Sequence, residues 1–316
     1  MNLSLIIPVY NEQENLPMLF DAIYQTMKPL HETWEVILVD DGSRDNSLSV
    51  LEKHAEKDPE HVRVISFRRN FGQTAAIAAG LDYSQGEIII LLDADMQNDP
   101  GDIPMLLDKL DEGYDLVSGW RKQRKDNAIT RNLPSMMANK LISLVTGVEL
   151  HDYGCTLKAY RREVLEGFRL YGEMHRFIPV FADSVGARIT EVVVNHHPRR
   201  FGKTKYGLER TAKVILDLFT VKFLVSFSSK PIYLFGGTGG FLMIASALIM
   251  LYLVVRRSLF LVSVTGSPLF QTSVMFFILG FQSMLMGLIA ELLVRTYHES
   301  QRKPTYTIRT RINLDD

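Results

Sequence analysis

The 316-residue sequence has one cysteine and no surplus of positive charge. The single Cys155 excludes an internal disulfide, and with it a small disulfide-stabilised fold. The sequence holds 35 Lys and Arg residues and 36 Asp and Glu residues, for a net charge of −1, so no bulk positive field favours a nucleic-acid partner. The mean hydropathy of +0.04 excludes a disordered chain. The length allows about two domains.

One stretch lacks charge almost completely. Between residues 231 and 290 the only charged side chains are Arg256 and Arg257. The uncharged run Ile232–Val255 is longer than the roughly 20 residues that a helix needs to cross a bilayer. A second uncharged run covers Leu269–Ala290. We therefore predict a hairpin of two transmembrane helices and a lipid bilayer as a partner.

Basic residues flank this apolar hairpin on both sides. Residues 199–230 hold eight Lys and Arg residues against two acidic ones, and Arg295, Arg302 and Lys303 follow the second span. Because Lys and Arg collect on the cytoplasmic side of membrane helices, we expect both flanks to be cytosolic. The N-terminus carries no secretory signal pattern, which agrees with this orientation. Arg256 and Arg257, in the expected outer loop, argue against this orientation, but the two flanks hold more basic residues.

The first two-thirds of the chain alternates short β-branched runs with longer amphipathic ones, which is typical of a doubly wound α/β fold. We expect strands at Leu3–Val9, Glu35–Asp40, Val62–Phe67, Glu87–Leu92, Leu116–Gly119 and Ile189–His196. Helices are expected at Glu12–Met27, Asn46–Glu56, Gln73–Tyr83, Ile103–Asp111 and Arg131–Val145. The expected segments are a catalytic domain over residues 1–207, an amphipathic juxtamembrane helix over 208–230, two transmembrane helices over 231–294 and a cytosolic tail over 295–316.

The fourth expected strand runs directly into two carboxylates, Asp93 and Asp95. Where the chain leaves the extended conformation, both side chains can converge on one hard cation, and Gln97 adds a neutral oxygen. Mg²⁺ and Mn²⁺ bind carboxylates together with substrate phosphates, so this donor set favours them. Two solvated turn aspartates are the alternative, and the buried aliphatic run before Asp93 argues against it.

Acidic and aromatic residues also follow the first two expected strands. Asp40 and Asp41 close the second strand, where a carboxylate can accept hydrogen bonds from a nucleotide base or ribose. After the first strand, Tyr10 can stack on a base and Glu12 can accept a hydrogen bond from it. Helix capping is the competing interpretation for Asn11.

Five motifs follow one another along the chain: Ile7–Glu12, Asp40–Ser43, Arg69–Gly72, Asp93–Gln97 and Arg199–Lys205. Their order resembles that of family 2 glycosyltransferases, and most closely the polyprenyl-phosphate glycosyltransferases, the group of dolichol-phosphate mannose synthase and undecaprenyl-phosphate sugar transferases. The segment Asp152–Arg162 and the tail from Glu291 to Tyr306 also look like that group. The resemblance implies a GT-A fold, a nucleotide-sugar donor, Mg²⁺ or Mn²⁺, and a polyprenyl phosphate acceptor. Homo-oligomers are common among similar proteins, so a second copy of the chain is a further implied partner.

The resemblance also assigns roles to individual residues. Positions matching the donor-nucleotide site are Pro8, Tyr10, Glu12 and Asp40. Positions matching the metal site are Asp93, Asp95 and Gln97. The basic loop that closes over the diphosphate in this family corresponds to Arg199 and Lys205. Positions matching the acceptor-phosphate site are Arg121, Arg131 and Ser135. For the neighbouring basic residues Lys122, Arg124 and Lys125, a solvated charged face is the alternative interpretation.

The expected reaction is inverting transfer of a sugar from a UDP- or GDP-sugar to undecaprenyl or dolichyl phosphate, at the cytosolic face of a bacterial or archaeal inner membrane. A phosphate monoester is already anionic near pH 7, so no general base is required; Asp152 and Asp95 are the nearest candidates. One alternative is a processive polysaccharide synthase, although the sequence lacks the Q-x-x-R-W motif of that class. The other is a non-catalytic nucleotide-binding membrane scaffold, against which the intact acidic set argues.

Overall fold

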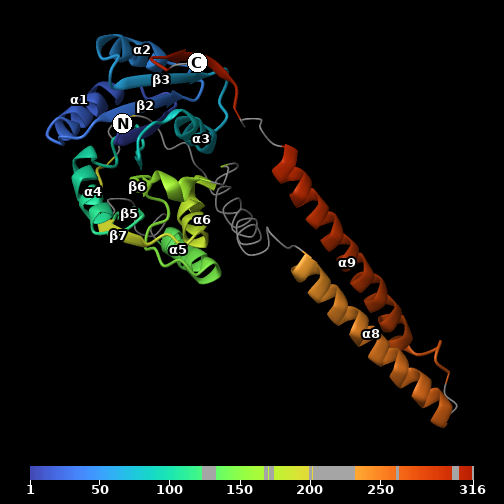
Figure 1. The fold of residues 1–316 in the computed structure, drawn as a ribbon. Helices are drawn as coiled ribbons and strands as arrows, with labels where there is room; N and C mark the ends of the chain where they lie inside the picture. Colours follow the sequence, from blue (N-terminus) through green and yellow to red (C-terminus); the bar gives the residue numbers. More distant parts are fainter. Residues whose placement is uncertain are drawn as a thin grey trace. The chain divides into compact units, whose positions relative to one another are not determined.

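The computed structural model describes residues 1–122, 133–166, 170, 174–198, 201, 232–260, 263–300 and 306–314 (Figure 1). The chain forms two compact units. One comprises Met1–Val221 together with Pro304–Asp316, and the other comprises Lys222–Lys303. The C-terminal residues therefore belong to the same unit as the N-terminal domain.

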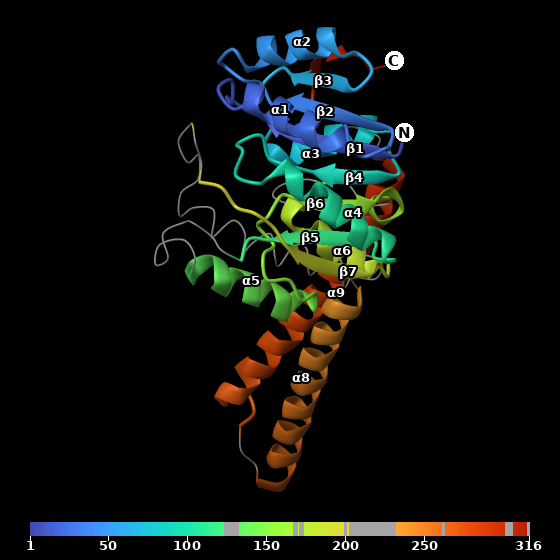
Figure 2. The same ribbon diagram turned by 90° about the vertical axis from the view of Figure 1, so that its left-hand side faces the viewer.

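A mixed β-sheet forms the centre of the first unit, with the order β7-β5-β6-β4-β1-β2-β3-β8 among the described residues (Figure 2). Its strands are β1 (Leu3–Val9), β2 (Trp34–Asp40), β3 (Val62–Phe67), β4 (Ile88–Leu91), β5 (Leu116–Trp120), β6 (Lys158–Arg161), β7 (Ile189–Val193) and β8 (Ile308–Ile312). Strands β1 to β4 are mutually parallel where they pair, whereas β6 and β8 run antiparallel to their neighbours. The predicted α/β fold is confirmed, but the sheet is mixed because β6 and β8, which we did not predict, join it.

The helices of this unit are α1 (Leu16–Met27), α2 (Ser47–Lys57), α3 (Gln73–Tyr83), α4 (Ile103–Asp111), α5 (Leu133–Thr146) and α6 (Ile178–Ser184). The side chains of β1 alternate between two cores, as the period of a strand requires. Leu5 and Ile7 pack with α1, α2 and α4, whereas Ile6 faces α3. A Cβ atom on Gly80 of α3 would lie 2.2 Å from Cγ2 of Ile6, so glycine permits the close approach of this helix to the sheet.

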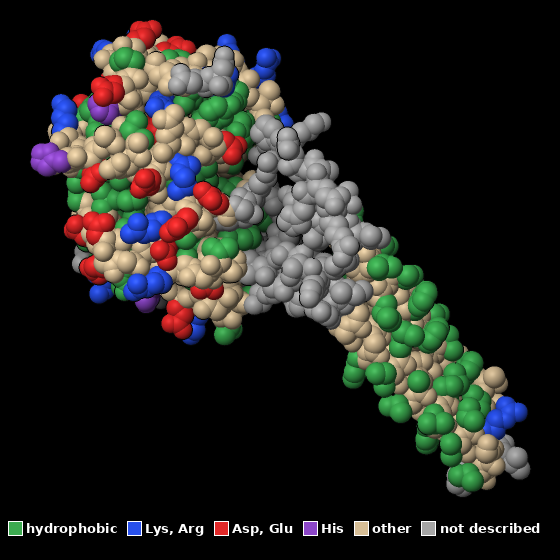
Figure 3. Space-filling view, in the orientation of Figure 1, with side chains coloured by type: hydrophobic (Ala, Val, Ile, Leu, Met, Phe, Trp, Pro, Cys, Tyr) green, Lys and Arg blue, Asp and Glu red, His purple; other side chains and the backbone are tan. Residues whose placement is uncertain are grey.

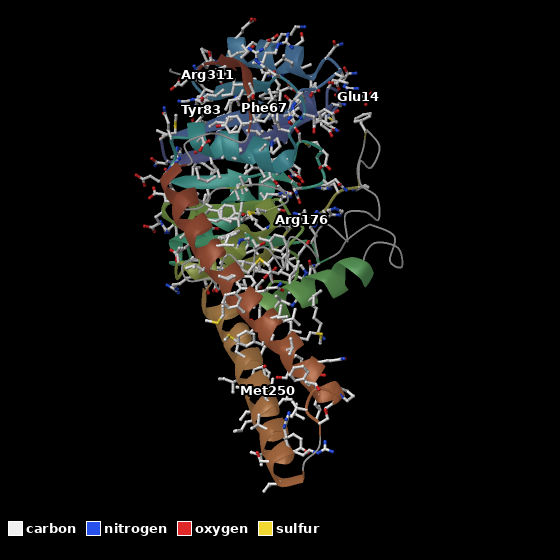
Figure 4. The ribbon with its side chains drawn as sticks, turned by 90° about the vertical axis from the view of Figure 1, so that its right-hand side faces the viewer. Glu14, Phe67, Tyr83, Arg176, Met250 and Arg311 are labelled. Atoms are coloured by element: carbon white, nitrogen blue, oxygen red, sulfur yellow. The ribbon has the colours of Figure 1, made fainter. Side chains whose placement is uncertain are left out.

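Strand β8 brings the residues after the apolar hairpin back into the sheet. Its Ile312 pairs with Val64 of β3 in an antiparallel register. Just before the strand, buried Tyr306 stacks on Phe67 with ring centroids 5.1 Å apart, and its hydroxyl donates to Asp82 at 2.7 Å. We expected only a tail there, although Ile-Arg-Thr-Arg-Ile alternates β-branched residues with arginine, which is a strand pattern. Figure 4 shows Phe67, Tyr83 and Arg311 in this corner of the domain.

The second unit contains two long apolar helices, α8 (Ile232–Phe260) and α9 (Pro268–Ser300). Phe235–Leu259 and Pro268–Ala290, with mean hydropathies of 2.2 and 1.9, are long and apolar enough to cross a membrane. Apolar side chains cover the visible face of this unit (Figure 3). Arg256 and Arg257 lie in the last turns of α8, not in the loop where we placed them.

Small residues bring α8 and α9 into backbone contact. A Cβ atom on Gly239 would lie 2.6 Å from the carbonyl oxygen of Gly280, and one on Gly280 would lie 2.7 Å from that of Gly239. Further along, the hydroxyl of Ser246 donates to the carbonyl of Ser273 at 2.7 Å, and the reciprocal bond is 3.0 Å long. Such close packing is how helices associate where no hydrophobic effect drives them together.

Replacing Tyr306 tests how strongly the C-terminal strand is anchored. We expect Tyr306→Ala to lower the stability of the sheet domain by about 3 kcal/mol, because it removes a buried aromatic ring. Tyr306→Phe keeps the ring and should cost only about 1 kcal/mol for the lost hydrogen bond to Asp82. Because Trp34 and Trp120, the two tryptophans, both lie in this domain, selectively excited tryptophan fluorescence during denaturation reports on it alone. Equal unfolding midpoints for Tyr306→Ala and the wild type would show that β8 is not anchored here.

Candidate active site

The predicted metal residues and the described donor residues lie at the ends of β1 and β2 or on the loops that follow β1 and β4. These strands are parallel, so their carboxyl ends share one edge of the sheet (Figure 2). The register places Val9 opposite Asp40 and Ile6 opposite Leu91. The sheet thus brings together the loop that begins at Tyr10, the acidic end of β2 and the acidic loop after β4. This is the edge at which open α/β sheets bind ligands.

Asn11 connects the loop after β1 to the loop after β2. Its backbone N–H donates to the hydroxyl of Ser43 at 3.0 Å, and its side-chain oxygen accepts from the backbone N–H of Arg44 at 2.8 Å. The positive φ of 53° at Asn11 belongs to a turn conformation that asparagine tolerates. Helix α1 begins only at Leu16, so the capping interpretation of Asn11 is wrong. The contact instead fixes part-buried Tyr10 beside the end of β2.

Asp40 is buried, with 1% of its surface exposed. Its Oδ1 accepts from the backbone N–H of Ser43 at 3.1 Å, and its Oδ2 accepts from the hydroxyl of Ser66 at 3.0 Å. Each carboxylate oxygen has two lone pairs, so both can still accept one further hydrogen bond. The structure therefore leaves acceptor capacity at Asp40 while fixing the orientation of its side chain.

The neighbouring Asp41 binds another segment of the protein backbone. Its carboxylate accepts from the backbone N–H groups of Phe71 at 2.6 Å and Gly72 at 2.9 Å. Burial raises the pKa of Asp41 to about 6, although these two hydrogen bonds oppose the rise. Gly42, with a φ of +68°, lets the backbone of Arg69 approach, because a Cβ atom there would lie 2.5 Å from the carbonyl carbon of Arg69. Asp41 thereby anchors the segment that leads into α3.

Two side chains from different elements hold Asp93. The amide of Gln73, the first residue of α3, donates to Oδ1 at 2.8 Å. The hydroxyl of Thr156, on the loop before β6, donates to Oδ2 at 2.7 Å. Burial, followed by the charge of Asp95, raises the pKa of Asp93 to about 6, while Thr156 and nearby cationic side chains act in the opposite direction.

Asp95 lies on a tight turn immediately after Asp93. It is 8% exposed, and its Oδ1 accepts from the backbone N–H of Gln97 at 3.1 Å. Met96 between them has a φ of +57°, which turns the chain back on itself. The turn keeps both carboxylates and Gln97 within one short loop at the end of β4.

This oxygen-rich loop fits a hard divalent cation. The mutual repulsion that contributes to the raised pKa of Asp93 is what a cation between two carboxylates would relieve. Across the described ranges no group of three or more His, Cys, Asp or Glu side chains gathers at a metal-binding distance. A cation held by Asp93, Asp95 and Gln97 would need further ligands, and substrate phosphates commonly complete the shell of Mg²⁺ or Mn²⁺.

Arg121 lies at the end of β5, close enough to Asp93 that its charge lowers the pKa of that carboxyl. Its guanidinium donates from Nε to Oδ2 of Asp152 at 2.7 Å and from Nη2 to Oδ1 at 3.0 Å. Asp152, one of two candidate general bases, is thus bound by an arginine through both oxygens. A second cation, Lys158, is buried nearby, and burial lowers its pKa.

The remaining predicted site residues have limited structural description. Ser135 lies in the first turn of α5, and its side chain is outside the described residues. Arg131, Arg199 and Lys205 also fall outside the described residues, as does the juxtamembrane segment 208–230. Their assigned roles therefore rest on the sequence motifs alone.

Sequence reasoning missed the residues that hold Asp93. Gln73 follows the motif Arg69–Gly72, so its place at the start of a helix after a strand was a usable signal. Thr156 lies in the segment Asp152–Arg162 that resembles the family, but nothing in the sequence placed that segment beside Asp93, because it reaches the site through the unpredicted antiparallel strand β6. Cys155 is buried, and burial raises the pKa of its thiol to about 11, in agreement with a packing role.

The raised pKa of Asp93 predicts a stability effect with a definite sign. A carboxyl group whose pKa is higher in the folded state destabilises the fold once it ionises, so the penalty is absent below about pH 4 and complete above about pH 6. In metal-free buffer at pH 7.5, Asp93→Asn should stabilise the domain by about 2 kcal/mol, and the gain should shrink as the pH falls through 6. The exposed-site control Glu60→Gln should change stability little. Lower stability of Asp93→Asn at pH 7.5, measured by denaturant unfolding, would contradict this interpretation.

Comparison with known proteins gives consistent matches. A family model described as "Glycosyl transferase family 2" matches residues 4–168. A dodecaprenyl-phosphate galacturonate synthase of Rhizobium johnstonii is 40% identical, over 98% of this chain and 92% of that protein. An undecaprenyl-phosphate 4-deoxy-4-formamido-L-arabinose transferase of Yersinia enterocolitica is 38% identical, over 97% of this chain and 92% of that protein.

Among solved structures, the glucosyl-3-phosphoglycerate synthase of Mycobacterium tuberculosis, in complex with Mn²⁺, uridine diphosphate and phosphoglyceric acid, superposes with a TM-score of 0.52. The match covers 70% of this chain and 78% of that one at 22% sequence identity, which supports the shared GT-A-like fold. The family model and the full-length relatives together show that the chain belongs to glycosyl transferase family 2.

Proposed function

We propose that this protein transfers a sugar from a UDP- or GDP-sugar to a polyprenyl phosphate at the membrane surface. The observation that carries the proposal is that a glycosyltransferase domain with two carboxylates at the end of β4 shares one chain with two helices long enough to span a bilayer. This combination suits an enzyme whose acceptor is held in a membrane. The names of the relatives from Rhizobium johnstonii and Yersinia enterocolitica, which act on dodecaprenyl and undecaprenyl phosphate, support the same acceptor class.

On the donor side, Asp93, Asp95 and Gln97 would hold Mg²⁺ or Mn²⁺. When bound, such an ion neutralises the negative charge that develops on the departing nucleoside diphosphate. The relative crystallised with Mn²⁺ and uridine diphosphate supports this role. Gln73 and Thr156 keep the Asp93 carboxylate in one orientation, which is the contribution that the surrounding protein makes to this site.

The nucleotide would bind at the ends of β1 and β2. Part-buried Pro8 and Tyr10 offer apolar surface and a ring for the base, while Glu12 and Asp40 offer hydrogen-bond acceptors. Arg199 and Lys205, assigned from the motif, would bind the diphosphate and stabilise its charge as the bond to the sugar breaks.

The acceptor phosphate would bind Arg121, with Arg131 and Ser135 assigned from the family motif. A phosphate monoester carries its negative charge near pH 7, so the oxygen that attacks the sugar needs no general base. Direct attack opposite the departing diphosphate inverts the anomeric configuration. The side chains then accelerate the reaction by placing the two substrates and stabilising charge.

The pairing of β8 with β3 supports a hairpin that crosses the membrane and returns. Because the chain leaves the sheet domain before α8 and rejoins it after α9, both ends of the hairpin lie in the compartment of that domain. We place this domain in the cytosol of a bacterial or archaeal cell, since Lys and Arg accumulate on both flanks of the hairpin.

A substrate panel tests the proposed reaction. We expect the purified chain, given Mg²⁺ or Mn²⁺ and a short polyprenyl phosphate, to convert one UDP- or GDP-sugar into a lipid-linked monosaccharide detected by mass. Asp95→Ala should lower the rate at least about 100-fold while leaving membrane insertion intact. The matched control is Asp99→Asn, which removes a carboxylate that follows the same strand as Asp95 and pairs with His197 after β7; this variant should retain activity. A polymeric product would favour a processive synthase, and no sugar transfer from any donor would favour a non-catalytic scaffold.

Cysteine labelling tests the topology, because the native Cys155 is buried and gives little background. In intact cells, a membrane-impermeant maleimide should label Ser263→Cys in the exposed loop between α8 and α9. Thr310→Cys, at an exposed position of β8, should be labelled only after the cells are lysed. Labelling of both variants in intact cells, or of Thr310→Cys alone, would contradict the cytosolic placement.

A further inference from the structure

Two neighbouring side-chain pairs join the end of β5 to the turn that precedes β6. The rings of Trp120 and His151 stack with centroids 4.2 Å apart and an interplanar angle of 18°. The next residue of each segment forms the second pair, in which Arg121 contacts Asp152 through two parallel hydrogen bonds. This pair is mostly shielded from water, since the side chains are 11% and 4% exposed.

The turn that carries Asp152 is held from the opposite side. Glu191 of β7 accepts hydrogen bonds from the backbone N–H of His151 at 2.9 Å and of Asp152 at 3.2 Å. The backbone N–H of Gly154 donates to Oδ1 of Asp152 at 3.1 Å. A Cβ atom on Gly154 would lie 3.2 Å from Nη2 of Arg121, so glycine leaves room for the guanidinium. Asp152 therefore has one orientation, fixed by its own turn and by β7.

This geometry is unsuited to a general base and suited to orienting a cation. Both oxygens of Asp152 accept N–H groups of Arg121, so a proton could be taken up only by disrupting a buried ion pair. The guanidinium is planar and binds carboxylates in a fixed two-point geometry, so the contact fixes its plane as well as its position. Among the described residues only Nε and Nη2 of the guanidinium donate to a side chain, so its other N–H groups can donate to another anion.

We propose that Asp152 is a positioning residue that holds Arg121 for binding the phosphate of the acceptor lipid. The inference rests on the proposed function, in which Arg121 contacts that phosphate. The charge of Arg121 reaches the Asp93 carboxyl and lowers its pKa, so Arg121 also lies near the predicted metal loop. A phosphate bound by Arg121 would thus be held near the carboxylates that serve the donor.

A double-mutant cycle tests this role in the full-length protein. Asp152→Asn keeps the shape of the side chain but removes its charge, so we expect the KM for a short polyprenyl phosphate to rise roughly 10- to 100-fold, with a much smaller change in kcat. The pH profile of kcat should keep its shape. In an Arg121→Ala background, Asp152→Asn should have almost no further effect, because it acts through Arg121.

Controls separate positioning from folding. Asp115→Asn removes a carboxylate that lies 3.9 Å from Arg161 at the other end of β5, and should leave both kinetic constants unchanged. Tryptophan fluorescence during unfolding reports whether Asp152→Asn folds. If Asp152→Asn does not fold, Glu191→Gln is the substitute, because it weakens the hydrogen bonds that hold the turn and keeps the Asp152 side chain. It should raise the KM for the polyprenyl phosphate by a smaller factor.

A large fall in kcat with an unchanged KM, repeated in the Arg121→Ala background, would overturn the positioning role and identify Asp152 as a base. Additive effects on KM in the cycle would overturn it as well. Both results require a wild-type protein that makes lipid-linked sugar. A wild type that makes none would instead overturn the proposed function, and this inference with it.

Discussion

Two carboxylates confined to one short loop are the constraint around which the catalytic domain is arranged. Burial, followed by the negative charge of Asp95, raises the pKa of Asp93 to about 6. Gln73 and Thr156 donate to Asp93, and the charges of Arg121 and Lys158 offset part of the repulsion. The domain thus tolerates a locally unfavourable charge that a divalent cation would stabilise, a common feature of functional sites.

Hydrogen bonds to Asp41 and Asp93 connect the segments beside the proposed donor and acceptor sites. Asp41, beside the expected nucleotide site, binds the backbone N–H of Gly72, and the next residue, Gln73, binds Asp93. On the other side, Thr156 belongs to the segment between Asp152 and β6. Two loops therefore meet at the Asp93 carboxylate, one beside the proposed nucleotide site and one beside the proposed acceptor site. Side chains that are already oriented need little rearrangement when charge develops during sugar transfer.

The parallel half of the sheet and the acidic loop could be predicted from sequence, because β1 to β4 are short, mainly apolar runs that end in polar turns. Strand β6 could not, since its Lys158 is buried through contacts that only the folded chain supplies. Strand β8 has the alternating pattern of a strand, but nothing in the sequence shows that a segment after a long apolar hairpin returns to pair with β3. The structural roles of Asp41 and Asp152 were also hidden, because a carboxylate that binds the protein's own loops has the same sequence signature as one that binds a ligand.

The central claim is that Asp93 and Asp95 bind a divalent cation that the sugar transfer requires. Its most direct test is the initial rate of lipid-linked sugar formation by protein treated with a chelator, before and after stepwise return of Mn²⁺ or Mg²⁺. The account predicts loss of at least about 99% of the rate on chelation and recovery that saturates with added ion. An undiminished rate in rigorously ion-free buffer would contradict it.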